Sequence, residues 1–349
     1  MLISFGAVLG KASVDQLAVV AVLEVVCYAA HKQLVLFGLL SVEDVGGSLS
    51  IHLWGAYFGL GCAYALGVPT DRGAAAEGAD KKTDVLALLG TTVLFVYWPS
   101  FVGAEVTGDA GASTRCTVNT YLALCGSALA SFLCSGLGNG GVGLRAVDVQ
   151  NASLAGGVGI GAIGRLKAVT PGGALAVGLL SGALSTWGYA SAQPRLLSTC
   201  GLHDTCGVHN LHGMPALLSG VASALFVAVA SRDQVYEHGA ATPGERAAYQ
   251  LLGTLATLVA AAVAGVLAGK VANAAAPRGA DYVTFHDAAG WDVGEDYESA
   301  WDAALDGSKH NATLDGSRKG IDGSKTGKKA TVNIKDVELA ANTSAHKAV

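Results

Sequence analysis

Long apolar runs separated by short polar segments make up most of the chain. The runs fall at about 15–39, 45–67, 83–104, 116–138, 146–166, 171–192, 207–231 and 247–273. Each is close to the roughly 17–25 residues that a tilted helix needs to cross a hydrocarbon layer about 30 Å thick. The pattern therefore predicts an all-α polytopic membrane protein with about eight spanning helices.

Polar residues interrupt the second run, residues 42–61, with the sequence VEDVGGSLSIHLWGAYFGLG. Asp44 precedes His52 by eight residues, or roughly 12 Å along a helix axis. If Asp44 lies at one face of the bilayer, His52 lies near its midplane. An ionisable side chain at that depth is costly, so this pattern indicates a functional site.

The same order of residues returns in DTCGVHNLHG, residues 204–213. Asp204, Gly207, Leu211 and His212 correspond to Asp44, Gly47, Ile51 and His52. Inverted repeats produce such paired insertions, and their shared site lies at the repeat interface near the middle of the membrane. We therefore expect a pseudo-twofold bundle in which His52 and His212 meet.

Two further runs carry residues that suit the membrane boundary. The third run ends LFVYWPSFVG, where Tyr97 and Trp98 are typical of an interfacial aromatic belt and Pro99 predicts an unwound helix end. Phe101 is a candidate plug for a pore mouth, and composition does not distinguish a plug from a belt. In the first run, we expect His31 and Lys32 to reach towards the boundary.

Composition argues against an ordinary soluble protein. The chain of 349 residues is 51% hydrophobic and only 14% charged, and its 48 glycines suit close helix packing in lipid. A net charge of -5 gives no indication of nucleic-acid binding. The spacing of the seven cysteines predicts neither disulfides nor a metal site, and His209 is interpreted as a polar packing residue. No cofactor is expected.

The ends of the chain differ in character. MLISFGAVLGK resembles the last turns of a helix, so we expect the amino terminus to be incomplete. An even number of spans places both ends, and Lys11, on one side. Polar, lysine-containing sequence from about 276 predicts a membrane domain over 1–275 and a cytoplasmic, largely disordered tail over 276–349.

Four segments, IHLWGAYFGL, VYWPSF, QNASLAGGV and DTCGVHNLHGMP, closely resemble the Rh glycoproteins of the ammonium transporter/Rh superfamily. The resemblance runs from Phe5 to about Asp296. It implies a homotrimer in the plasma membrane, each subunit having eleven or twelve helices and its own pore for ammonia. On this resemblance the first three or four family helices are missing. It further implies a transporter, not an enzyme, for ammonia or ammonium, with methylamine and carbon dioxide as further cargoes.

The resemblance also assigns roles to matching positions. His52 and His212 match the twin pore histidines of the family, Asp44 and Asp204 its symmetry-related aspartates, and Phe101 one of two vestibule gates. The family often has Asn-Glu where this chain has His31-Lys32. From the residues alone, two interpretations of the aspartates stay open: caps for exposed amides, or stabilisers of a passing cation.

Two alternative functions are weighed against the channel. The first is a non-conducting scaffold subunit of an Rh-type complex. The second is an intramembrane hydrolase that uses Asp44 and Asp204 as a catalytic dyad, although no Gly-x-Gly-Asp signature accompanies them.

Overall fold

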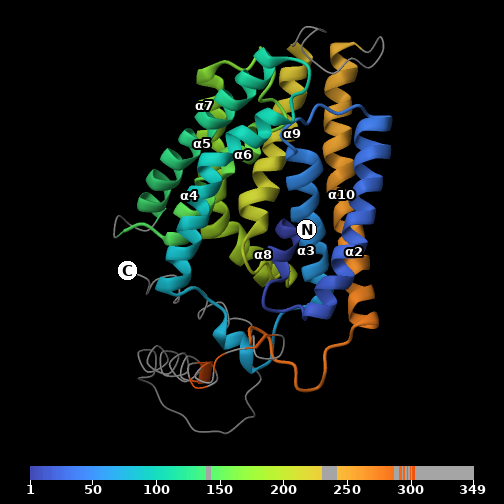
Figure 1. The fold of residues 1–349 in the computed structure, drawn as a ribbon, viewed down its shortest axis with the longest axis vertical. Helices are drawn as coiled ribbons and strands as arrows, with labels where there is room; N and C mark the ends of the chain where they lie inside the picture. Colours follow the sequence, from blue (N-terminus) through green and yellow to red (C-terminus); the bar gives the residue numbers. More distant parts are fainter. Residues whose placement is uncertain are drawn as a thin grey trace.

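The structure, a computed structural model, describes residues 1–138, 143–229 and 242–286, together with 291, 292, 294, 297, 299, 301 and 302. Within those residues all regular secondary structure is helical and no strand occurs, so the all-α prediction is confirmed. The long helices run side by side along the length of the molecule as a single bundle (Figure 1).

The helices follow one another with short connections. The α-helices are α1 (Leu2–Val8), α2 (Val14–Ala30), α3 (Trp54–Leu66), α4 (Lys81–Ala104), α5 (Ala110–Gly138), α6 (Ala155–Ile160), α7 (Pro171–Trp187), α8 (Gln193–Cys200), α9 (Met214–Val229) and α10 (Pro243–Ala275). Between them lie the π-helical segments η1 (His31–Leu39), η2 (Ser48–Leu53), η4 (Asp148–Ala152), η5 (Gly188–Ala192) and η6 (His209–Gly213), and a short 3-10 helix, η3 (Arg72–Ala76).

Six of the described helices are long and apolar enough to cross a membrane, when a π segment and the α-helix it continues are taken together. The predicted runs 146–166 and 171–192 are not among them. The first is broken into η4, α6 and a series of turns, and the second contains buried small polar residues such as Ser181 and Ser185. The count of eight spans is therefore not confirmed.

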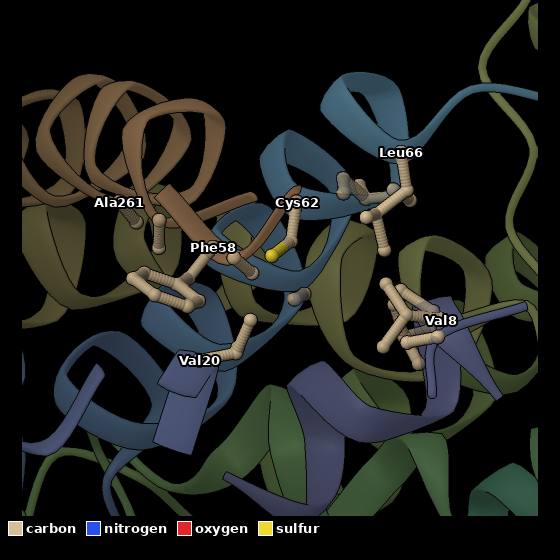
Figure 2. Packing of buried hydrophobic residues seen from close by; sticks show 14 of the residues in the cluster. Val8, Val20, Phe58, Cys62, Leu66 and Ala261 are labelled. Atoms are coloured by element: carbon tan, nitrogen blue, oxygen red, sulfur yellow. The ribbon is translucent and has the colours of Figure 1, made fainter. Parts of the chain in front are cut away.

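Helix α3 lies at the centre of one packed half of the bundle, between α1, α2 and α10. Figure 2 shows Phe58, Cys62 and Leu66 of α3 facing Val8 of α1 and Val20 of α2, with Ala261 of α10 close by. These side chains are almost completely buried. This packing fixes the helix that carries His52 against its neighbours.

Close backbone contact joins α5 to α7 in the other half. A Cβ added at Gly178 would lie 2.0 Å from the carbonyl oxygen of Ala123. No side chain fits in that space, so glycine is required for this approach, as expected where packing alone drives helix association in lipid.

Residues that follow α10 fold back onto the loops at one end of the bundle. Thr284 donates from its hydroxyl and its amide to the Asp71 carboxylate at 2.7 and 3.2 Å, and the Phe285 amide donates to the Gly10 carbonyl at 2.6 Å. Gly10 has a φ of +77°, and a Cβ there would lie 2.1 Å from the Phe285 ring. Most of the predicted disordered tail lies outside the described residues.

Candidate functional site

Two matching π-turns carry the candidate histidines. His52 lies in η2 and His212 in η6, and each turn continues directly into a long α-helix, α3 or α9. Each turn follows a glycine in the left-handed region, Gly47 at φ +69° and Gly207 at φ +72°. A side chain at either position would be strained, so the repeat read from the sequence is also a repeat of backbone conformation.

Asp44 and Asp204 cap the two turns. The Asp44 carboxylate accepts the Leu49 and Ser50 amides at 3.0 and 2.7 Å. The Asp204 carboxylate accepts three amides, those of residues 207, 208 and 209, at 2.9–3.0 Å. Burial raises the pKa of both carboxyls, that of Asp44 to about 6, although these amide hydrogen bonds oppose the increase. The capping interpretation thus has direct geometric support.

The two aspartates do not form a dyad. Asp44 lies before the first turn of the Ser48–Leu66 span. The charge of Asp204 acts on Lys11, whose ammonium reaches the Ala63 carbonyl at the other end of the same span. A catalytic pair requires two carboxyls within reach of one reacting group. The geometry therefore contradicts the aspartyl hydrolase.

The two histidines meet as the repeat predicted. His52 Nδ1 lies 3.0 Å from His212 Nδ1, and 5° separates the ring planes. A hydrogen bond between two Nδ1 atoms needs one donor and one acceptor, so the two neutral rings hold opposite tautomers. The remaining nitrogen of each ring, one a donor and one an acceptor, is then directed away from the pair.

A row of aromatic rings connects this pair with the surface. Trp98 of α4 is 3% exposed and stacks on His52 with 5.3 Å between ring centroids. Phe101 lies 5.7 Å beyond Trp98 and is 48% exposed. The expectation that Trp98 belongs to a lipid-facing belt is wrong, because it is buried within this row. The expected unwinding at Pro99 is also wrong, since α4 continues through it to Ala104.

Phe101 lines a vestibule of about 410 Å³. Three charged residues share its lining: Lys32, Asp44 and Glu105. The Lys32 ammonium lies 5.6 and 5.7 Å from the rings of Tyr28 and Phe37. His31 does not reach the boundary as expected, because it is 7% exposed and its Nε2 lies 2.9 Å from the Thr257 hydroxyl.

Sequence reasoning missed a second group of polar residues, at the far end of α3. Lys11 is 1% exposed, and its ammonium contacts both the ring and the carbonyl of His203. The only signal for this in the sequence is the position of His203 directly before Asp204. The rings of His209 and Tyr57 pack edge to face, with 5.8 Å between their centroids.

Two spans that begin at capped π-turns and bring two imidazoles together behind a row of aromatic rings define a polytopic membrane protein built on a repeat. The chain belongs to the Ammonium Transporter Family, whose sequence model matches residues 1–278. Since this is a family of transporters, the match confirms the expectation that the chain is not an enzyme.

Individual relatives place the chain on the Rh branch. It is 41% identical over 281 residues to rat Ammonium transporter Rh type B, a match that covers 77% of this chain and 61% of the relative. The human Rh type B protein is 39% identical over 280 residues, or 77% of this chain and 60% of that protein. The chain thus spans about 61% of the length of the first of these relatives.

A solved structure agrees with this placement. Rh50 from Nitrosomonas europaea, described with the Rhesus protein family of channels, superimposes with a TM-score of 0.73 at 35% identity. The match covers 90% of this chain and 78% of that one. The predicted Rh-type helical bundle is therefore confirmed.

Proposed function

We propose that this chain forms a path for ammonia across a membrane, with His52 and His212 in its wall. The observation that carries the proposal is their 3.0 Å contact between two pseudo-symmetric spans, behind the row formed by Trp98 and Phe101. The contact is not a product of local sequence, because 160 residues separate the two histidines.

The chemistry of the cargo suits this arrangement. Moving an ammonium ion into low dielectric costs on the order of 20 kcal/mol by Born solvation, whereas neutral ammonia crosses far more easily. Aromatic faces and carboxylates at the vestibule favour the cation, which passes its proton to vestibule water before the base enters. The two Nε2 atoms, one a donor and one an acceptor, take no part in the contact between the histidines. They can form hydrogen bonds with the neutral base within an otherwise apolar wall.

Phe101 acts in this proposal as the gate of the vestibule, and Asp44 and Asp204 hold the two turns in register. The wider predictions of methylamine or carbon dioxide as cargoes, a homotrimer in the plasma membrane and a cytoplasmic tail after a channel domain over 1–275 belong to the same proposal. Native mass spectrometry in detergent tests the trimer, which requires three times the 35.0 kDa mass of one chain.

Liposomes that contain the full 349-residue chain and an internal pH dye test the function. We expect an ammonia gradient to alkalinise them faster than empty liposomes, and we expect the His52→Leu/His212→Leu variant to change that rate while retaining its elution volume and helicity. His31→Gln is the matched control, because His31 is a buried histidine outside the vestibule lining. If neither the wild type nor the double variant carries flux, the scaffold function is favoured. If the double variant fails to fold, the histidine pair is structural.

A further inference from the structure

A second set of buried ionisable groups lies at the end of α3 opposite the vestibule. The Lys11 ammonium, in the turn between α1 and α2, donates to the His203 carbonyl at 2.7 Å and lies 3.5 Å from the Ala63 carbonyl. Its third neighbour is His203 Nδ1 at 3.2 Å. Each of the three ammonium hydrogens therefore has an acceptor.

His203 extends this contact to the surface. Its Nε2 lies 2.9 Å from Oε2 of Glu77, whose side chain is 30% exposed. An ammonium group only donates, so Nδ1 accepts from Lys11 and the ring hydrogen is on Nε2, from which it is donated to Glu77. An unbroken series of donors and acceptors thus joins a fully buried amine to a carboxylate in contact with water.

The buried end of this series lies next to the segment that leads into the turn carrying His212. Asp204 adjoins His203 in sequence, its charge acts on Lys11, and its carboxylate caps the turn that carries His212. Besides Asp204 and Glu77, Lys11 is influenced by Cys62 and by Arg278, whose guanidinium donates to the Lys11 carbonyl at 3.1 Å. Burial lowers the pKa of the Lys11 ammonium to about 8, although the two carboxylates oppose this. That value brings a neutral amine within reach near physiological pH.

We propose that Lys11, His203 and Glu77 form a proton relay that exchanges protons between the transported base, at the Asp204 end of the pathway, and the water outside. The inference rests on the proposed function, and it adds residues and a proton route that the histidine pair does not include.

Each step of the exchange balances. In the outward direction an N–H bond of Lys11 breaks and His203 Nδ1 takes the proton, while the Nε2 proton passes to Glu77, which releases it to water. Neutral Lys11 then takes a proton from an ammonium ion, so ammonia and a lysine ammonium are formed. The starting tautomer returns when the ring loses its Nδ1 proton to water and takes a proton from water at Nε2. In the inward direction the same steps run in reverse and protonate arriving ammonia.

Lys11→Arg separates a relay from a simple countercharge to Asp204. Arginine keeps the positive charge but does not release its proton in proteins. His203→Gln and Glu77→Gln keep hydrogen-bonding side chains and remove proton transfer, and Glu77, at 30% exposure, is the less buried of the two. They keep the test decisive if Lys11→Arg fails to fold.

The experiment measures initial rates of ammonium-driven flux in liposomes of the full chain from about pH 6 to about pH 8. In the variants we expect the rate to fall with the free-base concentration, about tenfold per pH unit. The wild-type rate should fall less steeply, so that near pH 6 the variants are slower by about tenfold or more. Combining the three substitutions should add little, because the residues act as a unit.

Failure of the relay can be distinguished from failure of the proposed function. If wild-type flux exceeds that of the His52→Leu/His212→Leu variant but all folded relay variants keep the wild-type pH profile, the relay is overturned and the proposed function stands. If Lys11→Arg matches the wild type, Lys11 is a countercharge and the relay is likewise overturned. If the wild-type chain carries no flux, the proposed function itself fails.

Discussion

Asp44 shows at the scale of one residue how a capping group can also carry a pH dependence. Its carboxylate satisfies two amides that the π-turn leaves open, yet burial raises its pKa to about 6 from an ordinary 3.8. The folded state therefore binds this proton more tightly than the unfolded state does. Between those two values stability falls as pH rises, because ionisation costs more in the folded chain.

Asp44→Asn removes this charge and keeps one acceptor oxygen. We expect the stability of the wild type, relative to this variant, to decrease by about 3 kcal/mol between about pH 4 and about pH 6.5. Thermal unfolding in detergent across that range measures the difference. A difference that is independent of pH, or that grows with pH, would contradict the buried, proton-binding carboxyl.

Lys32 gives the vestibule a positive charge beside Asp44 and Glu105. Lys32→Gln should raise the local concentration of cations, and we expect the concentration of methylammonium needed for half-maximal uptake to fall about two- to fivefold at low salt. The opposite change is expected for Glu105→Gln. Both effects should shrink as salt is added, and a salt-independent response would rule out an electrostatic origin.

At the scale of elements, the sequence was informative where polar residues interrupt apolar runs. Asp44, His52, Asp204 and His212 stand out against such runs, and their spacing predicted the meeting of the two imidazoles. The π-turns were not predictable, because the repeat does not indicate which backbone hydrogen bonds will form. The burial of Trp98 was hidden too, since an indole suits both a lipid boundary and a core.

Glycine contacts between helices were visible only as composition. The sequence shows many glycines, but which of them meet a backbone depends on how the helices cross. Gly178 and Gly172 belong to the same helix, yet a Cβ at Gly178 would lie 2.0 Å from the Ala123 carbonyl oxygen and a Cβ at Gly172 would meet nothing within 4 Å.

This pair gives a matched test of α5–α7 packing. Gly178→Ala should destabilise the chain by about 1–3 kcal/mol, because the helices must separate to admit the methyl group. Gly172→Ala should be neutral or stabilising by up to about 1 kcal/mol. Unfolding temperatures in one detergent compare them, and equal effects would show that α5 and α7 do not approach as described.

At the scale of the whole molecule, the residues directly after α10 pack against loops from the first part of the chain. The Phe285 ring covers Gly10, and Thr284 binds Asp71, so this segment lies over the turn that contains Lys11. The sequence analysis assigned all residues after 275 to the tail. The contacts of Thr284 and Phe285 involve few residues that are far apart in sequence, so no hydrophobic pattern reveals these contacts.

Phe285→Ala should loosen this attachment. Loss of the half-buried ring is worth about 1–2 kcal/mol, so we expect trypsin to cut after Arg278 about tenfold faster. Mass spectrometry of the fragments over time measures this cleavage. Asp281→Asn, an exposed change in the same segment, is the control. Equal cleavage of all three chains would mean that the Phe285 contact does not hold the segment.

The stacking of Trp98 on His52 gives the protein an internal optical reporter. The fluorescence of an indole is quenched more strongly by a nearby protonated imidazole than by a neutral one. A chain whose remaining tryptophans are replaced by phenylalanine would therefore signal, through the brightness of one fluorophore, when a proton arrives at the buried pair and when it leaves.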